Sequence, residues 1–238
     1  MDISVKSGFL LINKPCGISS YGCINHIKRI IKQKIKIGHA GTLDPFASGL
    51  LIVALGREAT RQIDHFMTME KTYVATGKCG ELTDTLDLTG TVVSTTAVIP
   101  TEEEIKTALA SFGSSYEQIP PLYSALKYQG NPLYALVRHN RMSTDELQQI
   151  AEAKKRMVQL YTLKLLSYEA PYFTISTRVS HGTYIRTLIN DIALRAGSYA
   201  TTHSLTRVAI GNFTLDNAVA LTDLNTIDDI NRMIILNV

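Results

Sequence analysis

This 238-residue sequence lacks several features that mark common classes of protein. It has three cysteines, Cys16, Cys23 and Cys79, but no CxxC pair, which argues against a disulfide framework and against a zinc site built on paired cysteines. Its six histidines show neither HxxxH nor HExxH spacing, so no metal site is predicted. Neither a GxGxxG motif nor a GxSxG motif occurs, so the sequence shows no dinucleotide-binding loop and no hydrolase nucleophile elbow.

Long apolar runs are also missing. No stretch reaches eighteen apolar residues, and the N-terminal residues include Asp2 and Lys6 in place of a signal-peptide core. The composition is nevertheless 45% hydrophobic and 19% charged, which is enough apolar material for a sizeable core and argues against disorder. We therefore expect a folded cytoplasmic protein with no membrane segment.

Charge of one sign is absent from whole stretches of the chain, although the formal net charge is only +3. No acidic residue occurs from Ile3 to Leu43, while residues 81–104 contain acids and no Lys or Arg. The seven cations of the first stretch are Lys6, Lys14, Lys28, Arg29, Lys32, Lys34 and Lys36. Such a cluster has two interpretations: a local footprint for phosphates, or simply the solvated face of a helix.

The order of apolar and polar residues predicts an α+β fold. Short strands are expected at residues 9–12, 50–53, 72–76, 91–94, 172–179 and 207–213, and helices near residues 19–34, 101–113 and 184–196. The elements do not alternate in a regular βαβ order, which favours a mixed, largely antiparallel central sheet flanked by helices. Residues 114–141 contain three prolines and four tyrosines in no clear period and are predicted to form a surface insertion.

The densest group of candidate catalytic residues is the loop from Gly38 to Pro45, which includes His39 and Asp44. Pro45 restricts Asp44 to an extended conformation, and a carboxylate on a stiff loop among cations can act as a nucleophile or general base. The alternative is an Asx turn in which Asp44 bonds only to its own backbone.

Two more residues, Arg186 and Tyr73, each have one functional and one purely structural interpretation. Arg186 falls in the first turn of a predicted helix, where a cation opposes the helix dipole; either it has a specific anionic partner, such as Asp44, or it is an ordinary surface arginine. Tyr73 either packs within a strand or stacks on an RNA base.

Several segments, taken in order, resemble the TruB family of tRNA pseudouridine synthases. The resemblance rests on residues 8–20, on residues 38–51 with His39 and Asp44, and on the Lys71-Thr72-Tyr73 triplet. It continues through the acidic segment 83–87, the segment 118–127 that begins Gln118-Ile119-Pro120-Pro121, and residues 182–186. These motifs are spread over most of the chain and occur in the family's order.

The resemblance implies a role for each matching residue. Asp44 corresponds to the catalytic aspartate, and the supporting active-site residues are then Arg186, Tyr73, Asp87 and Leu205. Residues expected to contact RNA are His39, Lys14, Tyr184 and Lys127. No cofactor and no metal are expected, because the family uses none.

The resemblance also implies an activity and a domain organisation. The expected reaction is isomerisation of uridine to pseudouridine at position 55 in the T loop of tRNA, by a monomer that binds the T arm and needs no protein partner. Alternatives are a synthase acting on other RNA, and an RNA-binding or tRNA-folding protein whose catalysis is dispensable. Residues 1–213 are expected to form the catalytic domain, of pseudouridine synthase fold, and residues 214–238 a short extension without a full RNA-binding barrel.

Overall fold

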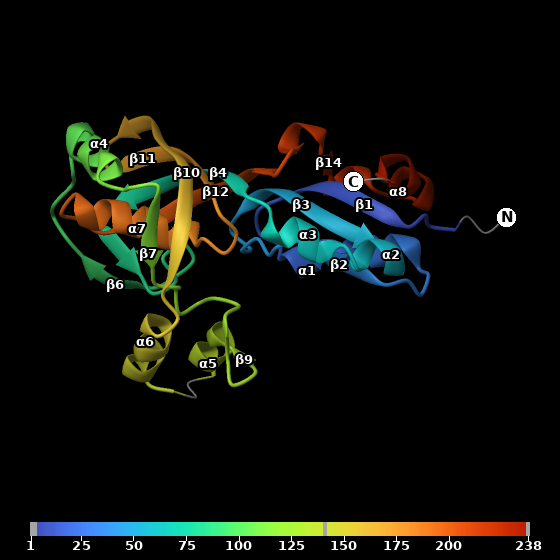
Figure 1. Cartoon of the computed structure of the whole chain (residues 1–238), viewed down its shortest axis with the longest axis horizontal. Helices are drawn as coiled ribbons and strands as arrows, with labels where there is room; N and C mark the ends of the chain where they lie inside the picture. Colours follow the sequence, from blue (N-terminus) through green and yellow to red (C-terminus); the bar gives the residue numbers. More distant parts are fainter. Residues whose placement is uncertain (1–3, 140–141, 237–238) are drawn as a thin grey trace. The chain divides into compact units, whose positions relative to one another are not determined.

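The computed structural model describes residues 4–139 and 142–236. The first residue, the last residue and the end of the predicted insertion at residue 141 lie outside this range. The chain forms two compact units: unit 1 contains Met1–Tyr73 with Leu205–Val238, and unit 2 contains Val74–Ser204. It passes from unit 1 to unit 2 within strand β4 (Lys71–Cys79) and returns within strand β12 (Ala200–Ile210) (Figure 1).

Unit 1 is built on a mixed sheet with the strand order β14, β1, β3, β12. β1 is antiparallel to β3, β14 is parallel to β1, and β12 is parallel to β3 through Arg207 opposite Gly49. The remaining strands of this unit are short and pair at the edges, β2 on β3 and β13 on β12. The strand bounds are β1 Gly8–Lys14, β2 Ile37–His39, β3 Ser48–Leu55, β13 Phe213–Thr214 and β14 Val219–Ala220.

Apolar residues cover both faces of this sheet, which explains why β1 and β3 are almost continuously hydrophobic. On one face, alternate residues of β1 and β3 pack against helix α1 (Ser20–Ile31) and against Leu221, Leu224 and Ile230 of the C-terminal segment. On the other face, Phe66 of helix α3 (Ile63–Thr68) packs against the intervening residues. The other helices of the unit are α2 Gly56–Thr60, α8 Ile227–Met233 and the 3-10 turns η1 Leu215–Asn217 and η2 Leu221–Asp223.

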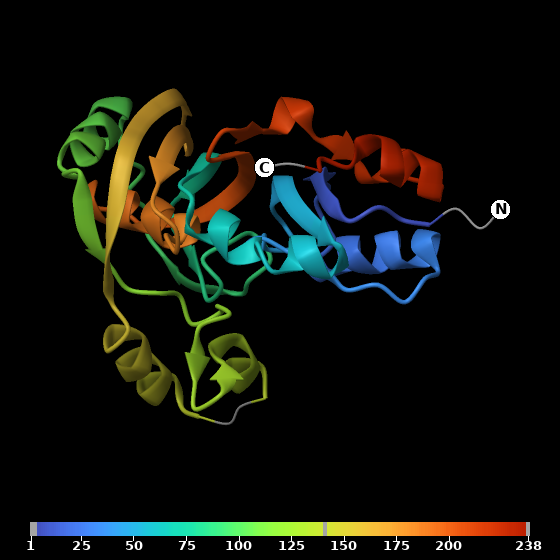
Figure 2. The same ribbon diagram turned by 45° about the vertical axis from the view of Figure 1, so that its right-hand side comes forward.

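The C-terminal segment is part of this core. Val219 and Ala220 pair with β1, and Ile235 forms a further bridge to Phe9, so the segment runs beside β1 (Figure 2). The chain after residue 213 therefore contributes a strand and core side chains to unit 1. Among the described residues, no helix is long and apolar enough to span a membrane.

Helix α1 confirms the predicted start and corrects the predicted end. Ser19 caps the helix by accepting a hydrogen bond from the Gly22 amide. The helix ends at Ile31 because Lys32 adopts a left-handed conformation with φ of 50°. Lys28, Arg29 and Lys32 are exposed, as a solvated helix face requires.

Unit 2 contains the strands β12, β4, β11, β10 and β7 in that order. Strand β10 is antiparallel to both of its neighbours. The strand bounds are β5 Glu81–Thr83, β6 Val92–Thr95, β7 Ser115–Gln118, β8 Lys127–Tyr128, β9 Asn131–Pro132, β10 Arg156–Glu169 and β11 Tyr172–Val179. The helices are α4 Glu102–Ala110, α5 Leu133–Arg138, α6 Thr144–Glu152 and α7 Ile185–Arg195.

Two strand predictions in this part of the chain were wrong in detail. The strand expected at residues 72–76 is longer and runs from Lys71 to Cys79. The acidic segment 83–87, here called the acidic turn, follows the short strand β5, which pairs with β6. The last long strand begins at Ala200 and not at residue 207, because the buried Thr201 hydroxyl bonds to the Glu81 carbonyl and keeps a polar segment inside the sheet.

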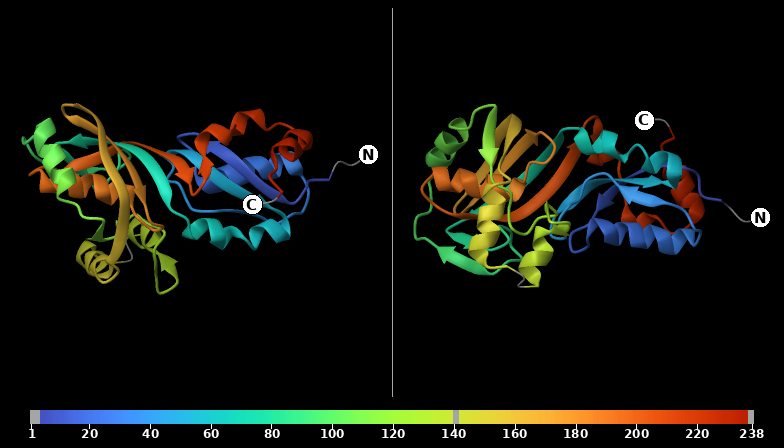
Figure 3. Two further views of the ribbon diagram at one scale, coloured as in Figure 1. Left: turned by 45° about the horizontal axis from the view of Figure 1, so that its top comes forward. Right: turned by 60° about the horizontal axis from the view of Figure 1, so that its bottom comes forward.

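The predicted insertion begins with a sheet strand, since β7 pairs with β10. The residues after it form the β8–β9 hairpin and α5, and α5 packs against α6 through Leu133, Leu136 and Leu147 (Figure 3). In both units, then, a mixed and largely antiparallel set of strands is flanked by helices. The predicted fold class is confirmed.

Candidate active site

The loop that carries Asp44 is fixed on both sides of that residue. The Ser20 hydroxyl, at the start of α1, accepts a hydrogen bond from the Leu43 amide at 2.8 Å and lies 3.1 Å from the Leu43 carbonyl oxygen. The Gly17 amide donates to the Pro45 carbonyl at 2.8 Å. Asp44 itself is half-buried. The loop therefore holds its carboxylate on a backbone that is anchored immediately before and immediately after it.

Lys14 lies inside the protein beneath this loop. Its side chain is fully buried, and its ammonium donates to the carbonyls of Pro15 at 2.9 Å, Ile18 at 2.7 Å and Pro45 at 3.4 Å. Burial lowers the pKa of Lys14, while the negative charge of groups that include Asp44 opposes that shift. Lys14 thus joins the segment after β1 to the Asp44 loop, and its contact with RNA stays a prediction.

Arg207 is a second buried cation at the same loop. It is 1% exposed, and its guanidinium donates to the Leu50 carbonyl on β3 at 2.8 Å and to the Gly41 carbonyl at 3.1 Å. Together with burial, its charge lowers the pKa of the half-buried His39, which favours a neutral imidazole. His39 Nδ1 is buried and makes no hydrogen bond to any described residue.

Tyr73 and Leu205 are both buried side chains, at 9% and 6% exposure, near the points where β4 and β12 leave and re-enter unit 1. Two residues before Tyr73, the Lys71 ammonium donates to the carbonyls of Met67 and Met69, at 2.6 Å each, at the end of α3. Burial lowers the pKa of Lys71 to about 8, with a further contribution from Arg207. Lys71 therefore fixes the start of β4 against α3.

Arg186 and Asp87 form a buried ion pair in unit 2. The guanidinium Nη1 lies 3.7 Å from the Asp87 carboxylate, and the two side chains are 5% and 7% exposed. The guanidinium also donates to the Thr85 carbonyl at 2.5 Å and to the Tyr123 carbonyl at 2.9 Å. Asp87 accepts further hydrogen bonds from the Thr85 hydroxyl at 2.9 Å and from the Thr89 amide at 2.9 Å. The acidic turn thus forms a rigid acceptor site for Arg186.

The remaining predicted residues are more exposed. Tyr184 is half-buried at the N-cap of α7, and the Arg156 guanidinium lies 5.2 Å from the centre of its ring. Lys127 is exposed on β8. Asp44 and Arg186 belong to different units, and the pairing expected between them stays a prediction.

Sequence reasoning missed three polar residues that hold the site. Ser20 and Arg207 fix the Asp44 loop, and Gln118, which is 1% exposed, bonds to the backbone of Tyr184. Gln118 was noticed only as part of a motif. Their partners lie far away in sequence, so composition and local periodicity carry no signal for them.

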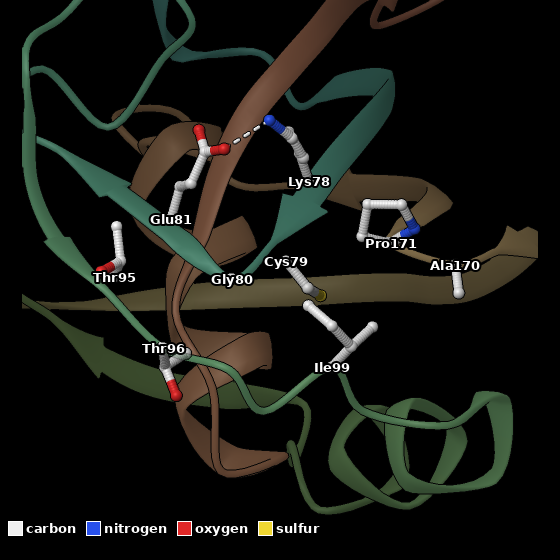
Figure 4. Close-up of a pocket in the computed structure, with 9 residues that line it drawn as sticks. All are labelled: Lys78, Cys79, Gly80, Glu81, Thr95, Thr96, Ile99, Ala170 and Pro171. Carbon is white, nitrogen blue, oxygen red and sulfur yellow. Dashed lines mark hydrogen bonds and ion pairs between the residues drawn. The ribbon is translucent and has the colours of Figure 1, made fainter.

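Unit 2 also contains a hollow (Figure 4). It measures about 580 Å³, and its lining includes the Lys78–Glu81 ion pair and Cys79, whose pKa is raised to about 11 by burial. None of the predicted site residues lines it. Among the described residues, no group of three or more His, Cys, Asp or Glu side chains is placed to hold a metal ion.

The chain is similar to known proteins that modify RNA. Residues 28–185 match the family described as TruB family pseudouridylate synthase (N terminal domain). The tRNA pseudouridine synthase B of Protochlamydia amoebophila (strain UWE25) is 38% identical over 230 residues, which are 97% of this chain and 84% of that protein. The corresponding protein of Bordetella avium (strain 197N) is 43% identical over 225 residues, covering 93% of this chain and 88% of the relative.

Solved structures are similar as well. The crystal structure of a Cbf5-Nop10-Gar1 complex contains a chain that is 29% identical, with a TM-score of 0.68 over 93% of this chain. The match covers 54% of that chain, so the present protein spans about half its length. The fold and sequence together define an RNA-modifying isomerase of the pseudouridine synthase class. More narrowly, the chain belongs to the TruB family of pseudouridylate synthases.

Proposed function

We propose that this protein converts uridine to pseudouridine in tRNA, at position 55 of the T loop. Relatives that are 37–43% identical over most of the chain are named tRNA pseudouridine synthase B. The observation that carries the proposal is the anchored loop around Asp44, because a carboxylate can act on one particular bond only if its position is fixed. The proposed catalytic residue is Asp44.

The proposed reaction begins when the protein grips the T arm through its phosphates and the target uridine leaves its stack. Asp44 then assists cleavage of the bond between N1 and C1′, by attack on the base, by attack on the sugar or by removal of the C2′ proton. The uracil rotates and rejoins C1′ through C5, and the proton lost from C5 balances the one gained at N1. Water must be kept out, since it would hydrolyse the separated sugar.

The other site residues have supporting roles in this proposal. Tyr73 packs against the target base and Leu205 lines the uracil pocket, which suits their burial. Arg186, held by Asp87, supports the catalytic carboxylate. The residues proposed to contact RNA are His39, Lys14, Tyr184 and Lys127. No cofactor takes part.

We further propose that the protein acts as a cytoplasmic monomer without a protein partner. Solved structures that are 25–29% identical include a Cbf5-Nop10-Gar1 complex and an H/ACA RNP bound to substrate RNA. The higher identity to proteins named as tRNA enzymes favours free tRNA over an RNA selected by a guide. Residues 1–213 are proposed to be the catalytic domain, with residues 114–141 as its surface insertion.

The test uses purified protein and tRNA transcripts that carry tritium at C5 of uridine. The wild-type protein should release tritium without any added partner, and a transcript with cytidine at position 55 should lose that release. Asp44→Asn should keep tRNA binding, measured by filter retention, and release no tritium, whereas Asp64→Asn, a change at an exposed aspartate of the same unit, should behave as wild type. Near-normal turnover by Asp44→Asn would show that Asp44 is not the catalytic residue. Turnover that requires a guide RNA would show that the substrate is an RNA selected by that guide and not free tRNA.

A further inference from the structure

Helix α7 places Arg186 in its first turn but begins without a side-chain cap of its own. Its N-cap residue, Tyr184, makes no side-chain capping bond. The first turn of a helix has backbone amides with no partner inside the helix, so an uncapped start tends to fray. A residue whose position matters for catalysis would thus sit on the least constrained part of its helix.

Gln118 supplies the missing constraint from strand β7. Its side-chain carbonyl accepts the Tyr184 amide at 2.7 Å, and its side-chain NH2 donates to the Tyr184 carbonyl at 3.0 Å. The same Tyr184 carbonyl accepts the first helical bond, from the Leu188 amide at 3.1 Å. Gln118 therefore grips both polar groups of one residue at the base of the helix, as a neighbouring strand would.

The orientation of this amide is itself fixed. The NH2 group also donates to the Tyr116 hydroxyl at 2.5 Å, and Tyr116 is hydrogen-bonded in turn to Asp191 on the same helix. Since the Tyr116 oxygen accepts from Gln118, its own proton points to Asp191. Every polar group of the 1%-exposed Gln118 side chain is thereby used, and a flipped amide would break all three bonds.

The same short segment reaches Arg186 a second time. Five residues after Gln118, the Tyr123 carbonyl accepts the Arg186 guanidinium at 2.9 Å. Pro120 and Pro121 lie between the two contacts and restrict the backbone, so the spacing between them is stiff. Residues 118–123 therefore hold both the helical backbone next to Arg186 and the tip of its side chain.

We infer that Gln118 is a positioning residue for Arg186: its two-point grip on Tyr184 fixes the first turn of α7 and thereby the place of the guanidinium. This inference rests on the proposed function for its catalytic consequence. Loss of the grip frees the backbone of Tyr184 and lets Arg186 shift, whereas Gln118 makes no hydrogen bond with the other described residues proposed to bind RNA, His39, Lys14 and Lys127. A small misplacement of a supporting group can lower a rate by about a hundredfold.

The decisive variant is Gln118→Met, which keeps the length of the side chain and removes its polar groups. We expect kcat for tritium release to fall by about 10- to 100-fold, a larger change than the change in KM for tRNA. Hydrogen exchange measured by NMR should quicken at the Tyr184 amide. The control is Gln149→Met, which makes the same change at an exposed position on α6 and should alter neither quantity.

A second variant keeps the test decisive if Gln118→Met does not fold. Gln118→Glu has the same shape and still accepts the Tyr184 amide, but its carboxylate faces the Tyr184 carbonyl and cannot donate. Its kcat relative to wild type at the same pH should be low at pH 8 and should recover toward pH 5, where the introduced carboxyl gains a proton and becomes a donor. A merely structural contact would give no such recovery.

The outcomes separate this inference from the proposed function. If wild-type protein releases no tritium from tRNA, the proposed function fails, and the exchange rate of the Tyr184 amide still decides whether Gln118 holds the helix. If wild-type protein is active and Gln118→Met keeps both its kcat and the slow exchange of Tyr184, the inference is overturned. The inference would also be overturned if the ratio of kcat for Gln118→Glu to kcat for wild type were the same at pH 8 and at pH 5.

Discussion

Asp191, a half-buried residue of helix α7, should make the protein less stable as the pH rises from about 4 to about 6. Burial raises the pKa of this carboxyl from 3.8 to about 6, against the opposing effects of the Tyr116 hydrogen bond and the Arg195 charge. A raised pKa in the folded state means that stability is fully present below pH 3.8 and is lost as the pH rises through 6. The difference between the two pKa values corresponds to about 3 kcal/mol, an upper figure because the side chain is only half-buried.

Asp191→Asn tests this reasoning because the substituted side chain has the same shape, still accepts the Tyr116 hydrogen bond and cannot ionise. The free energy of unfolding, measured by urea denaturation at several pH values, should be nearly equal for the variant and the wild type at pH 4. At pH 7 the variant should be more stable by about 1–3 kcal/mol. Asp216→Asn, at an exposed position, is the control and should show no such pH-dependent difference. A constant difference between Asp191→Asn and wild type from pH 4 to pH 7 would refute the assignment.

Two further substitutions test how the Asp44 loop is held. Arg207→Met removes the two hydrogen bonds of a buried guanidinium, so the free energy of unfolding should fall by about 3–5 kcal/mol. Arg207→Lys should restore less than half of that loss, because an ammonium lacks the planar fork of the guanidinium. A fall below about 1 kcal/mol for Arg207→Met would contradict this role of Arg207. Gly49 has a φ of 106°, and Gly49→Ala would place a Cβ against the Arg207 carbonyl and 2.7 Å from the Arg207 amide nitrogen, so the free energy of unfolding should fall by about 3 kcal/mol or more. Gly197 has a φ of 78° with nothing within 4 Å of the added Cβ, so Gly197→Ala should lower it by about 1 kcal/mol. Thermal or urea unfolding of the two glycine variants checks this, and equal losses would show that the close approach of β3 and β12 is not the cause.

Much of the fold could be predicted because its local signals agree with its tertiary contacts. Ser19 and Thr101 are N-cap residues, and both predicted helix starts are confirmed by side-chain bonds to backbone amides. The apolar runs in β1 and β3 are buried on both faces, as continuous hydrophobicity indicates. The sequence was sufficient to predict a helix or strand wherever its capping residue or its apolar pattern alone determined the structure.

Prediction failed where buried polar groups are satisfied by distant partners. The start of β12 was missed because Thr201 and Thr202 look like loop residues, although Thr201 donates to Glu81, which lies 120 residues earlier. Gln118 was missed for the same reason, since its partner Tyr184 is 66 residues away. A polar residue in a strand gives no local sign of which distant backbone group it will meet.

The acid-free stretch at the N-terminus has two structural consequences, and only one of them is a solvated surface. Lys28 and Arg29 are exposed on α1, but Lys14 is fully buried and donates only to backbone carbonyls. Lys71 and Arg207 are bonded in the same way, and among the residues that the structure describes none of these three cations forms an ion pair with a carboxylate. A carboxylate would neutralise their charge, whereas carbonyls hold the cations in place and leave a positive potential around the loop. Because Lys14 bonds to carbonyls and not to a paired carboxylate, the same side chain can fix the Asp44 loop and keep its surroundings attractive to a polyanion such as RNA.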